Sequence, residues 1–342
     1  MTGKARIELR PTPHIHAPQD VVVIMRNVVL ACLPLVAWAI WQYGLSALAL
    51  CITVVAACLL TERLFGRAET LHDWSAVITG LLLFLTLPPG FPLWMGAVAG
   101  FIAIGLGKML FGGLGLNVFN PALVGRAFVQ AAFPVAITTW IPAFFEGRFS
   151  GFIPSTFTTP FTIPPETAAW AGKVAVDAFT GATPLALAKF EQTLVPAREL
   201  FLGSTAGSAG ESSALLVLLC GLYLAARKML DWRIPVSVLA GAAGAASLFH
   251  LLDPARYPDA GFMLFSGGLM LGAWFMATDM VGSPVTPLGV VIYGLLIGVV
   301  TVIIRLFGGL TEGVMYAILL GNAATPLIDQ LTQPRVFGEK RS

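Results

Sequence analysis

Two similar six-residue stretches, identical in their first five residues, decide the fold: LFGGLG at Leu110–Gly115 and LFGGLT at Leu306–Thr311. Each copy follows an apolar segment and precedes a segment with an Asn-Pro-Ala or Asn-x-Ala break, NVFNPALVG after the first copy and LLGNAATPLI after the second. GFPLW, which begins at Gly90, is echoed by VTPLG, which begins at Val285. Because the motifs recur in the same order, we predict two homologous halves.

The composition predicts a protein whose surroundings are mostly lipid. Hydrophobic residues make up 57% of the 342 residues and charged residues only 11%, and the mean hydropathy is +0.83. A soluble domain carries about 25% charged residues, so this chain has too few to cover a water-facing surface. The formal net charge of +2 provides no electrostatic argument for binding nucleic acid.

Ten apolar segments approach or reach the length of about 17–25 residues that spans a bilayer. They start near Val28, Gly44, Ser75, Leu93, Asn117, Ser213, Ile234, Phe262, Leu288 and Glu312. The third and eighth are short, and the fifth and tenth are interrupted by polar residues and proline. We therefore expect an all-α polytopic membrane protein with about ten transmembrane helices in two five-helix repeats. An odd number of spans in each repeat inverts the second repeat, and broken segments at matching positions point to a binding site.

The predicted organisation has five parts. They are a cytoplasmic arm (1–26), the first repeat (27–137), an outward-facing loop (138–212), the second repeat (213–331) and a cytoplasmic tail (332–342). Lys and Arg concentrate in the arm, the tail and the connections on their side, which predicts that both termini are cytoplasmic. A loop as long as the central one is usually functional or disordered.

The central loop contains VAVDAFTGATPLALA, Val174–Ala188, and its Thr183 allows two interpretations. Thr183 followed by Pro184 has the pattern of a helix N-cap with proline in the first helical position. Alternatively, the Thr183 hydroxyl carries a covalent modification, since Gly181 and Ala182 leave it uncrowded. The two interpretations are compatible, because backbone N–H groups at a helix start favour a phosphate.

Several longer motifs surround this stretch and make it specific. They are FGGLGLNVFNPALVGRAF (Phe111–Phe128), MLGAWFMATDMVGSPVTP (Met270–Pro287), IRLFGGLTEGVMYAILLGNAATPLID and the final QPRVFG. Over nearly its whole length the chain resembles the D subunit of the Rnf electron-transport complex. The homologous B subunit of the sodium-pumping NADH:quinone oxidoreductase is similar, but the short N-terminal region here favours the Rnf protein. A solute transporter or channel with no redox role is a further alternative, since inverted repeats with broken helices also suit that class.

The resemblance implies that Thr183 carries FMN through a phosphoester bond. Thr180, Gly181 and Ala182 complete the family's motif, and Asp177 lies just upstream. A flavin transferase would attach the FMN. The chain would be an electron-transfer component in the bacterial inner membrane, with the A, B, C, E and G subunits as partners in a ferredoxin:NAD oxidoreductase that moves Na⁺ or H⁺. Iron–sulfur and NAD sites would belong to those partners, in agreement with four isolated cysteines and no CxxC in this chain.

The resemblance also suggests a second, non-covalent flavin, riboflavin, within the spans. Asn117 and Asn120 lie three residues apart beside Pro121, so their amides would share one helical face and could bind its ring. Alternatively, both amides satisfy the broken helix itself. Arg126 falls inside the fifth span, where it would face a flavin or a neighbouring subunit, or extend to the membrane surface.

Carboxylates near the ends of spans are candidates for an ion path. Asp279 ends the eighth segment and Asp329 closes the tenth, although a solvated carboxylate is the commoner situation at a span end. We interpret Glu62 and Arg63 as a cytoplasmic helix cap.

Overall fold

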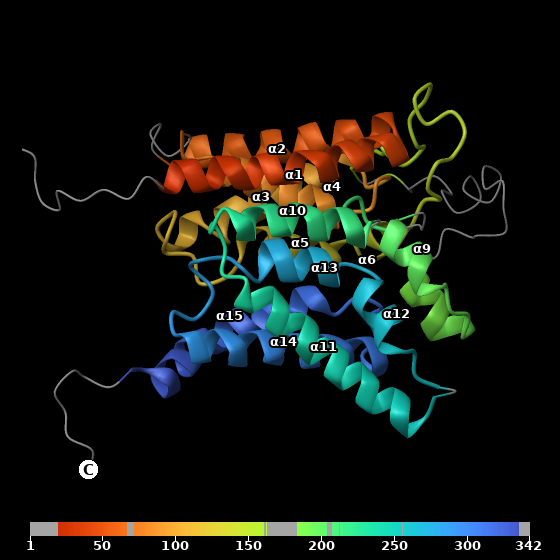
Figure 1. The fold of residues 1–342 in the computed structure, drawn as a ribbon. Helices are drawn as coiled ribbons and strands as arrows, with labels where there is room; N and C mark the ends of the chain where they lie inside the picture. Colours follow the sequence, from red (N-terminus) through yellow and green to blue (C-terminus); the bar gives the residue numbers. More distant parts are fainter. Residues whose placement is uncertain are drawn as a thin grey trace, which may run out of the picture.

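The computed structural model describes residues 20–66, 72–160, 162, 183–203, 207–211, 213–254 and 256–334. Every regular element within these ranges is a helix (Figure 1). Five helical stretches among them are long and apolar enough to cross a membrane: Val21–Tyr43, Leu45–Phe65, Leu93–Phe111, Arg233–Leu252 and Pro287–Phe307. The expectation of a polytopic helical membrane protein is confirmed at this level.

The first half of the chain contributes five longer helices, besides the short η2 (Met109–Phe111) and α6 (Pro134–Ile137). The five longer helices are α1 (Val21–Tyr43), α2 (Leu45–Phe65), α3 (Ser75–Thr86), α4 (Leu93–Gly105) and α5 (Pro121–Ala132). α2 packs against α3 and α4, and α5 packs against the same two helices. The short α3 is thereby enclosed by neighbouring helices, and all but two of its residues are buried.

The second half has a similar order. It contains α10 (Ala214–Ala226), α11 (Arg233–Leu252), α12 (Ala260–Phe265), α13 (Leu269–Leu271) continued by the π-helix η4 (Gly272–Met276), α14 (Pro287–Phe307) and α15 (Val314–Thr332). α11 packs along α14, and α15 packs against α14 and η4. The halves meet where α1 contacts α10 and where α5 contacts α15.

Small residues allow the helices to approach closely, as is usual in membrane bundles. A Cβ atom at Gly125 of α5 would lie 2.6 Å from the carbonyl oxygen of Ala99 on α4. A Cβ atom at Gly241 of α11 would lie 2.7 Å from the carbonyl oxygen of Leu295 on α14. Any larger side chain at either glycine would separate the two backbones.

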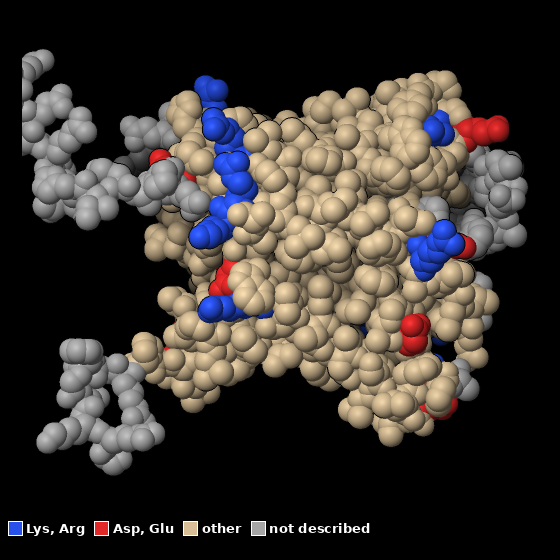
Figure 2. All heavy atoms as spheres, viewed as in Figure 1, with Lys and Arg blue, Asp and Glu red and all other residues tan. Residues whose placement is uncertain are grey.

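The surface has the distribution that a bilayer requires. In the face shown in Figure 2, charged side chains gather at the two ends of the molecule, and a band without Lys, Arg, Asp or Glu separates them. Large apolar side chains are exposed on several helices, among them Leu30, Ile52, Leu219, Leu248 and Ile303. The start of α1 and the end of α15 lie at one end, and α9 (Ala197–Leu202) lies at the other (Figure 1).

The early end of α3 is confirmed, and its cause is local. Leu87 precedes Pro88 and has extended dihedral angles, φ −90° and ψ 151°, because a proline disfavours helix in the residue before it. The carbonyl groups left open at this end accept hydrogen bonds from the segment before α10. Ala209 N–H donates to Leu87 O at 3.1 Å and Gly210 N–H to Leu85 O at 2.7 Å.

The structure corrects the predicted interruptions in two places. The tenth segment is not broken, since α15 runs continuously through Pro326, and the Thr325 hydroxyl donates to Gly321 O at 3.1 Å. The eighth segment has a break that the sequence did not lead us to expect, between Phe265 and Leu269. Gly267 adopts a positive φ of 61° there, a conformation that favours glycine. The sequence Ser-Gly-Gly at 266–268 could have indicated this break, because adjacent glycines are typical of turns.

Candidate functional site

A cavity between the two halves brings together several of the residues singled out from the sequence. Its polar lining residues are Ser75, Thr79, Lys108, Asn117, Asn120, Thr278 and Asp279. Its apolar walls come from α1, α3, α5, α10 and η4, and include Ile24, Val28, Leu82, Leu224, Trp274 and Phe275. Apolar walls with a few convergent polar groups are the usual form of a cofactor site.

Asn120 serves the broken helix, as one of the two interpretations predicted. Its Oδ1 accepts hydrogen bonds from the N–H groups of Ala122 (3.0 Å) and Leu123 (3.4 Å), which makes it the N-cap of α5. Its Nδ2 donates to the carbonyl oxygen of Met276 at 3.2 Å. The side chain therefore joins the start of α5 to the end of η4 in the other half.

Asn322, at the position that the repeat matches to the first break, completes this junction. Its Oδ1 accepts a hydrogen bond from the backbone N–H of Asn120 at 3.4 Å. Its Nδ2 donates to Gly282 O at 2.9 Å and to the Tyr293 hydroxyl at 3.0 Å. The two motif asparagines are thus in direct contact across the halves.

Asn117 and Asp279 also meet, which the sequence alone did not indicate. Asn117 Nδ2 donates to Asp279 Oδ2 at 3.3 Å and to Phe119 O at 3.2 Å. The other oxygen of Asp279 accepts the Val281 N–H at 3.2 Å. Among the described residues nothing donates to Asn117 Oδ1, so this acceptor is available at the cavity wall.

The two candidate ion-path carboxylates are not brought together. Asp329 lies on α15, and its Oδ1 accepts the backbone N–H of Val285 at 3.1 Å in an exposed position. It therefore holds the segment that leads into α14. No hydrogen bond joins Asp329 to Asp279 in the described part of the chain.

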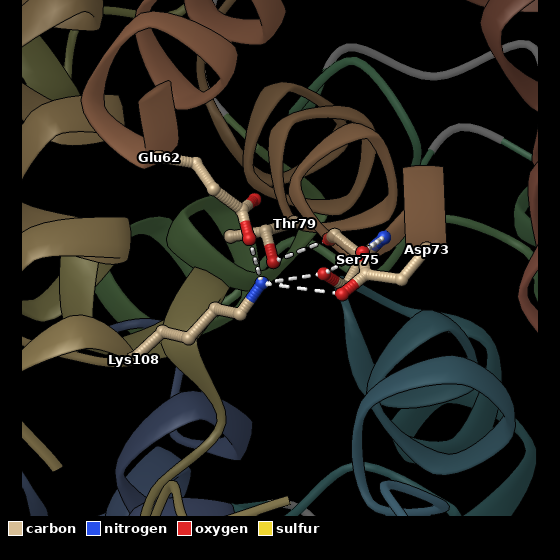
Figure 3. Close-up of polar contacts among 5 residues, drawn as sticks. All are labelled: Glu62, Asp73, Ser75, Thr79 and Lys108. Carbon is tan, nitrogen blue, oxygen red and sulfur yellow. Dashed lines mark hydrogen bonds and ion pairs between the residues drawn. The ribbon is translucent and has the colours of Figure 1, made fainter. Parts of the chain in front are cut away.

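The Lys108 cluster consists of Glu62, Asp73, Ser75 and Lys108 (Figure 3). Lys108 Nζ forms an ion pair with Glu62, donates to Ser75 Oγ at 2.5 Å and lies 4.0 Å from Asp73. The Ser75 N–H donates to Asp73 at 2.8 Å, and Ser75 is the first residue of α3. The interpretation of Glu62 as a cytoplasmic cap is wrong, because its side chain is fully buried against Lys108.

The Arg305 cluster consists of Arg126, Glu211, Arg305 and Glu312, and it lies around the break before α13. Arg305 donates to the carbonyl oxygens of Met263 (2.7 Å) and Ser266 (3.0 Å) and to Glu312 (3.3 Å). Glu312 in turn accepts the Gly268 N–H at 3.0 Å. Sequence patterns did not reveal this cluster, apart from Arg126, because its members come from four separate segments.

Arg126 does not extend to the membrane surface. It lies on α5 with only 5% of its surface exposed, and it lines a small cavity with Glu211 and Glu312. Its Nη1 has no hydrogen-bond partner among the described residues. Burial raises the pKa of Glu211 to about 7, and the nearby Glu312 carboxylate adds to the rise while Arg126 opposes it.

Thr183 is the N-cap of α8 (Pro184–Ala186), which continues as the π-helix η3 (Leu187–Glu191). Its Oγ1 accepts the Ala186 N–H at 3.2 Å, so the capping interpretation is confirmed. The other motif residues, Asp177, Thr180, Gly181 and Ala182, lie outside the described residues.

Lys189 attaches the Thr183 helix to the second copy of the repeated motif. Its Nζ donates to the carbonyl oxygens of Arg305 (3.0 Å), Gly308 (2.5 Å) and Leu310 (3.0 Å) at the end of α14. A cation is favourable at a helix C-terminus, where carbonyl groups lack helical partners. Burial lowers the pKa of Lys189.

Fold and sites together define a polytopic helical membrane protein whose broken helices meet at buried polar clusters. The chain belongs to the NQR2, RnfD, RnfE family, whose model matches residues 8–338. This confirms the resemblance found in the sequence motifs.

Curated relatives cover nearly the whole chain. It is 41% identical to the D subunit of the Na⁺-translocating ferredoxin:NAD⁺ oxidoreductase complex of Acetobacterium woodii, over 98% of this chain and 96% of the relative. It is 40% identical to the D subunit of the ion-translocating oxidoreductase complex of Halorhodospira halophila, with the same coverage. The D subunit of the proton-translocating ferredoxin:NAD⁺ oxidoreductase complex of Clostridium ljungdahlii is 39% identical, over 96% of both chains.

Proposed function

We propose that this chain is the D subunit of an ion-translocating ferredoxin:NAD oxidoreductase complex in a bacterial inner membrane. The observation that carries the proposal is similarity to proteins of that name along nearly the full length of both chains. The A, B, C, E and G subunits are the expected partners, and they would contain the ferredoxin and NAD sites. Electrons would pass through this chain on flavins, and Asp279 and Asp329 are candidates for its ion path.

The proposal includes two inverted five-helix repeats, with α1–α5 in one and α10–α15 in the other, where α12 and α13 with η4 count as one broken helix. Its support is the matching packing order: α2 with α4 and α11 with α14, then α4 with α5 and α14 with α15. The first LFGGL motif follows α4, and the second begins at the last two residues of α14, so the two motifs lie at corresponding places in the two halves. Both termini would be cytoplasmic, and α8, α9 and Thr183 would then lie on the outer side.

Thr183 is the proposed attachment point of FMN. In an N-cap the threonine oxygen accepts a hydrogen bond, so the hydroxyl proton is not needed for the cap. A phosphoester would replace that proton and keep the oxygen. The first backbone N–H groups of the helix lie close by, where a phosphate is favoured. The residues present therefore fit the group, which would supply one- and two-electron redox chemistry.

The cavity beside Lys108 is the proposed site of a second, non-covalent flavin. Apolar side chains such as Val28, Leu82 and Phe275 offer surfaces for a planar ring. Asn117 Oδ1 offers an acceptor, and the buried Lys108 places a positive charge at the wall. Charge and hydrogen bonds near a flavin ring tune its electronic properties, so these groups would set the potential of a flavin bound there.

The mass of the denatured chain tests the covalent site. Wild-type chain, co-expressed with a flavin transferase, should carry the additional mass of FMN and fluoresce in a denaturing gel. Thr183→Ala should remove both signals, while Thr180→Ala in the same motif should keep them. Wild-type chain without the additional mass would refute the flavin attachment and favour a transporter or channel with no redox role.

Non-covalent flavin, extracted after denaturation, tests the cavity. Asn117→Leu should reduce the amount extracted at least several-fold. Asn27→Leu is the matched control, since Asn27 is also a buried amide but does not line the cavity. Equal flavin content in both variants would contradict the second site. Identification of the proteins that co-purify separates the Rnf complex from the quinone reductase.

A further inference from the structure

Two carboxylates from separate segments converge on one glycine in the Arg305 cluster. A Cβ atom at Gly268 would lie 2.7 Å from Glu211 Oε1 and 3.2 Å from Glu312 Oε2. Glu211 lies just before α10, and Glu312 lies just before α15. Only a residue without a side chain lets both carboxylates approach this point.

The carboxylates and Arg126 line a common cavity. Its other lining residues include Thr86, Gln130 and Leu271, and its volume is about 20 Å³. This volume holds roughly one water molecule. The buried Nη1 of Arg126, without a partner among the described residues, is a donor at this cavity. An unsatisfied buried guanidinium group is costly, so the cavity requires an acceptor such as a water molecule or a carboxylate.

We propose that Glu211, Glu312, Arg126 and the cavity between them form a proton-binding site at the contact between the two halves of the chain. The proton adds to a carboxylate oxygen of Glu211 and forms an O–H bond, which leaves this residue neutral. No electron is transferred. Glu312 accepts hydrogen bonds from Arg305 and from the Gly268 N–H.

The surroundings of Glu211 favour a proton at physiological pH. The charged and titratable groups that face it are Glu312 beside α15, Arg126 on α5, Arg305 on α14 and Tyr43 on α1. The net effect of these charges and of burial raises the pKa of Glu211 to about 7, where small changes in the cluster alter its protonation. Na⁺ suits this site poorly, because a one-water cavity offers few ligands and two guanidinium groups repel a cation.

The site goes beyond the proposed flavin function, because it requires no flavin. It lies close to the Thr183 helix, however, since Leu185 Cδ1 would lie 2.7 Å from a Cβ atom at the adjacent Gly267. A proton bound here would therefore change the electrostatic potential beside that helix.

Infrared spectroscopy of the full-length chain in lipid nanodiscs tests the site, with a titration between about pH 5 and pH 9. Wild-type chain should show a carboxylic acid C=O band that titrates near pH 7. Glu211→Gln should remove this band. Glu199→Gln should keep it, because Glu199 is exposed on α9 outside the cluster. A band that persists in Glu211→Gln would overturn the proposal.

Two further variants distinguish a proton site from a structural ion cluster. Arg126→Gln should move the midpoint to higher pH by about one unit, and Glu312→Gln should move it to lower pH by a similar amount. If Glu211→Gln does not fold, Glu211→Asp replaces it and should keep the band with a changed midpoint. If the titration midpoint of the band is the same in Arg126→Gln, Glu312→Gln and wild-type chain, the proposed site is refuted. Loss of the band on addition of Na⁺ at constant pH would show a Na⁺ site instead.

Discussion

The Lys108 cluster and the Arg305 cluster each place a buried cation beside the start of a short helix, α3 in the first half and α13 in the second. The two clusters differ in which half of the chain supplies their residues. Lys108 contacts Glu62 and Ser75 at the N-terminus of α3, and every member of its cluster comes from the first half. Arg305 and Glu312 hold the N-terminus of α13, and the first half adds Arg126 to this cluster. The Lys108 cluster therefore contains residues of one half only, whereas the Arg305 cluster contains residues of both halves.

This difference separates two roles for buried charge. A lysine held by buried acidic partners is suited to tune a ligand in the neighbouring cavity. Arg126, Glu211 and Glu312 line a water-sized cavity, and burial together with the Glu312 carboxylate raises the pKa of Glu211 to about 7, so that its protonation can change near physiological pH. Substitutions in the two clusters should therefore differ in size and in pH dependence.

The largest effect is expected for Lys108→Met. The substitution leaves the buried Glu62 carboxylate without this cation, and removing one partner of a buried pair costs about 3–5 kcal/mol. Thermal unfolding of the purified chain in detergent should show a large drop in Tm. Glu62→Gln combined with Lys108→Met should recover part of the loss. Lys228→Met is the control on an exposed lysine, and an equal drop there would refute the assigned role.

Arg305→Met should destabilise the chain less than Lys108→Met. The carbonyl oxygens of Met263 and Ser266 lose a charged donor, at a cost of about 1–3 kcal/mol, but Arg126 remains near Glu312. The same unfolding measurement provides the comparison. A larger loss for Arg305→Met would mean that Arg126 does not compensate and that the clusters are more alike than we infer.

Stability should decrease as pH rises through the titration of Glu211. Its pKa is about 7 in the folded chain against an ordinary value of 4.5, so between these values the folded state binds more protons than the unfolded state. Unfolding free energy then falls with increasing pH across this interval. Glu211→Gln should flatten this part of the profile, with a higher Tm than wild type above about pH 7. Parallel profiles would contradict the assigned pKa.

The smallest effect is expected for Lys189→Met, which frees the Thr183 helix from the end of α14. The loss of three hydrogen bonds from Nζ should leave the membrane bundle intact but open Pro184–Glu191 locally. Hydrogen exchange in this segment should accelerate about tenfold. Arg198→Met, on the exposed face of α9, should leave the rate unchanged. Unchanged exchange in Lys189→Met would show that other contacts hold the helix.

Local patterns were sufficient to predict much of the fold. Pro88 after a short apolar run predicted the end of α3, and Asn120 with Pro121 predicted the start of α5, because both depend on neighbouring backbone groups. The prediction for α15 was wrong, since a proline within a helix removes one donor and the surrounding bundle tolerated that loss.

The candidate site depended on distant residues and was only partly predictable. Asn117 and Asp279 were both singled out, but their contact joins positions 162 residues apart. Glu62 was misassigned because a carboxylate near a helix end is usually solvated. Only the position of Lys108 beside it shows that this one is buried.

By itself the sequence determined the class of protein, the family, the repeated motifs and the N-cap at Thr183. These properties follow from composition and from residues close together in the chain. The tertiary structure alone decided that Asn120 meets Asn322 and that Arg126, Glu211 and Glu312 share one cavity. The physical reason is that a buried charge or amide needs hydrogen-bond partners, and helix packing supplies them from distant parts of the chain. The residues adjacent in sequence do not indicate which distant residues these will be.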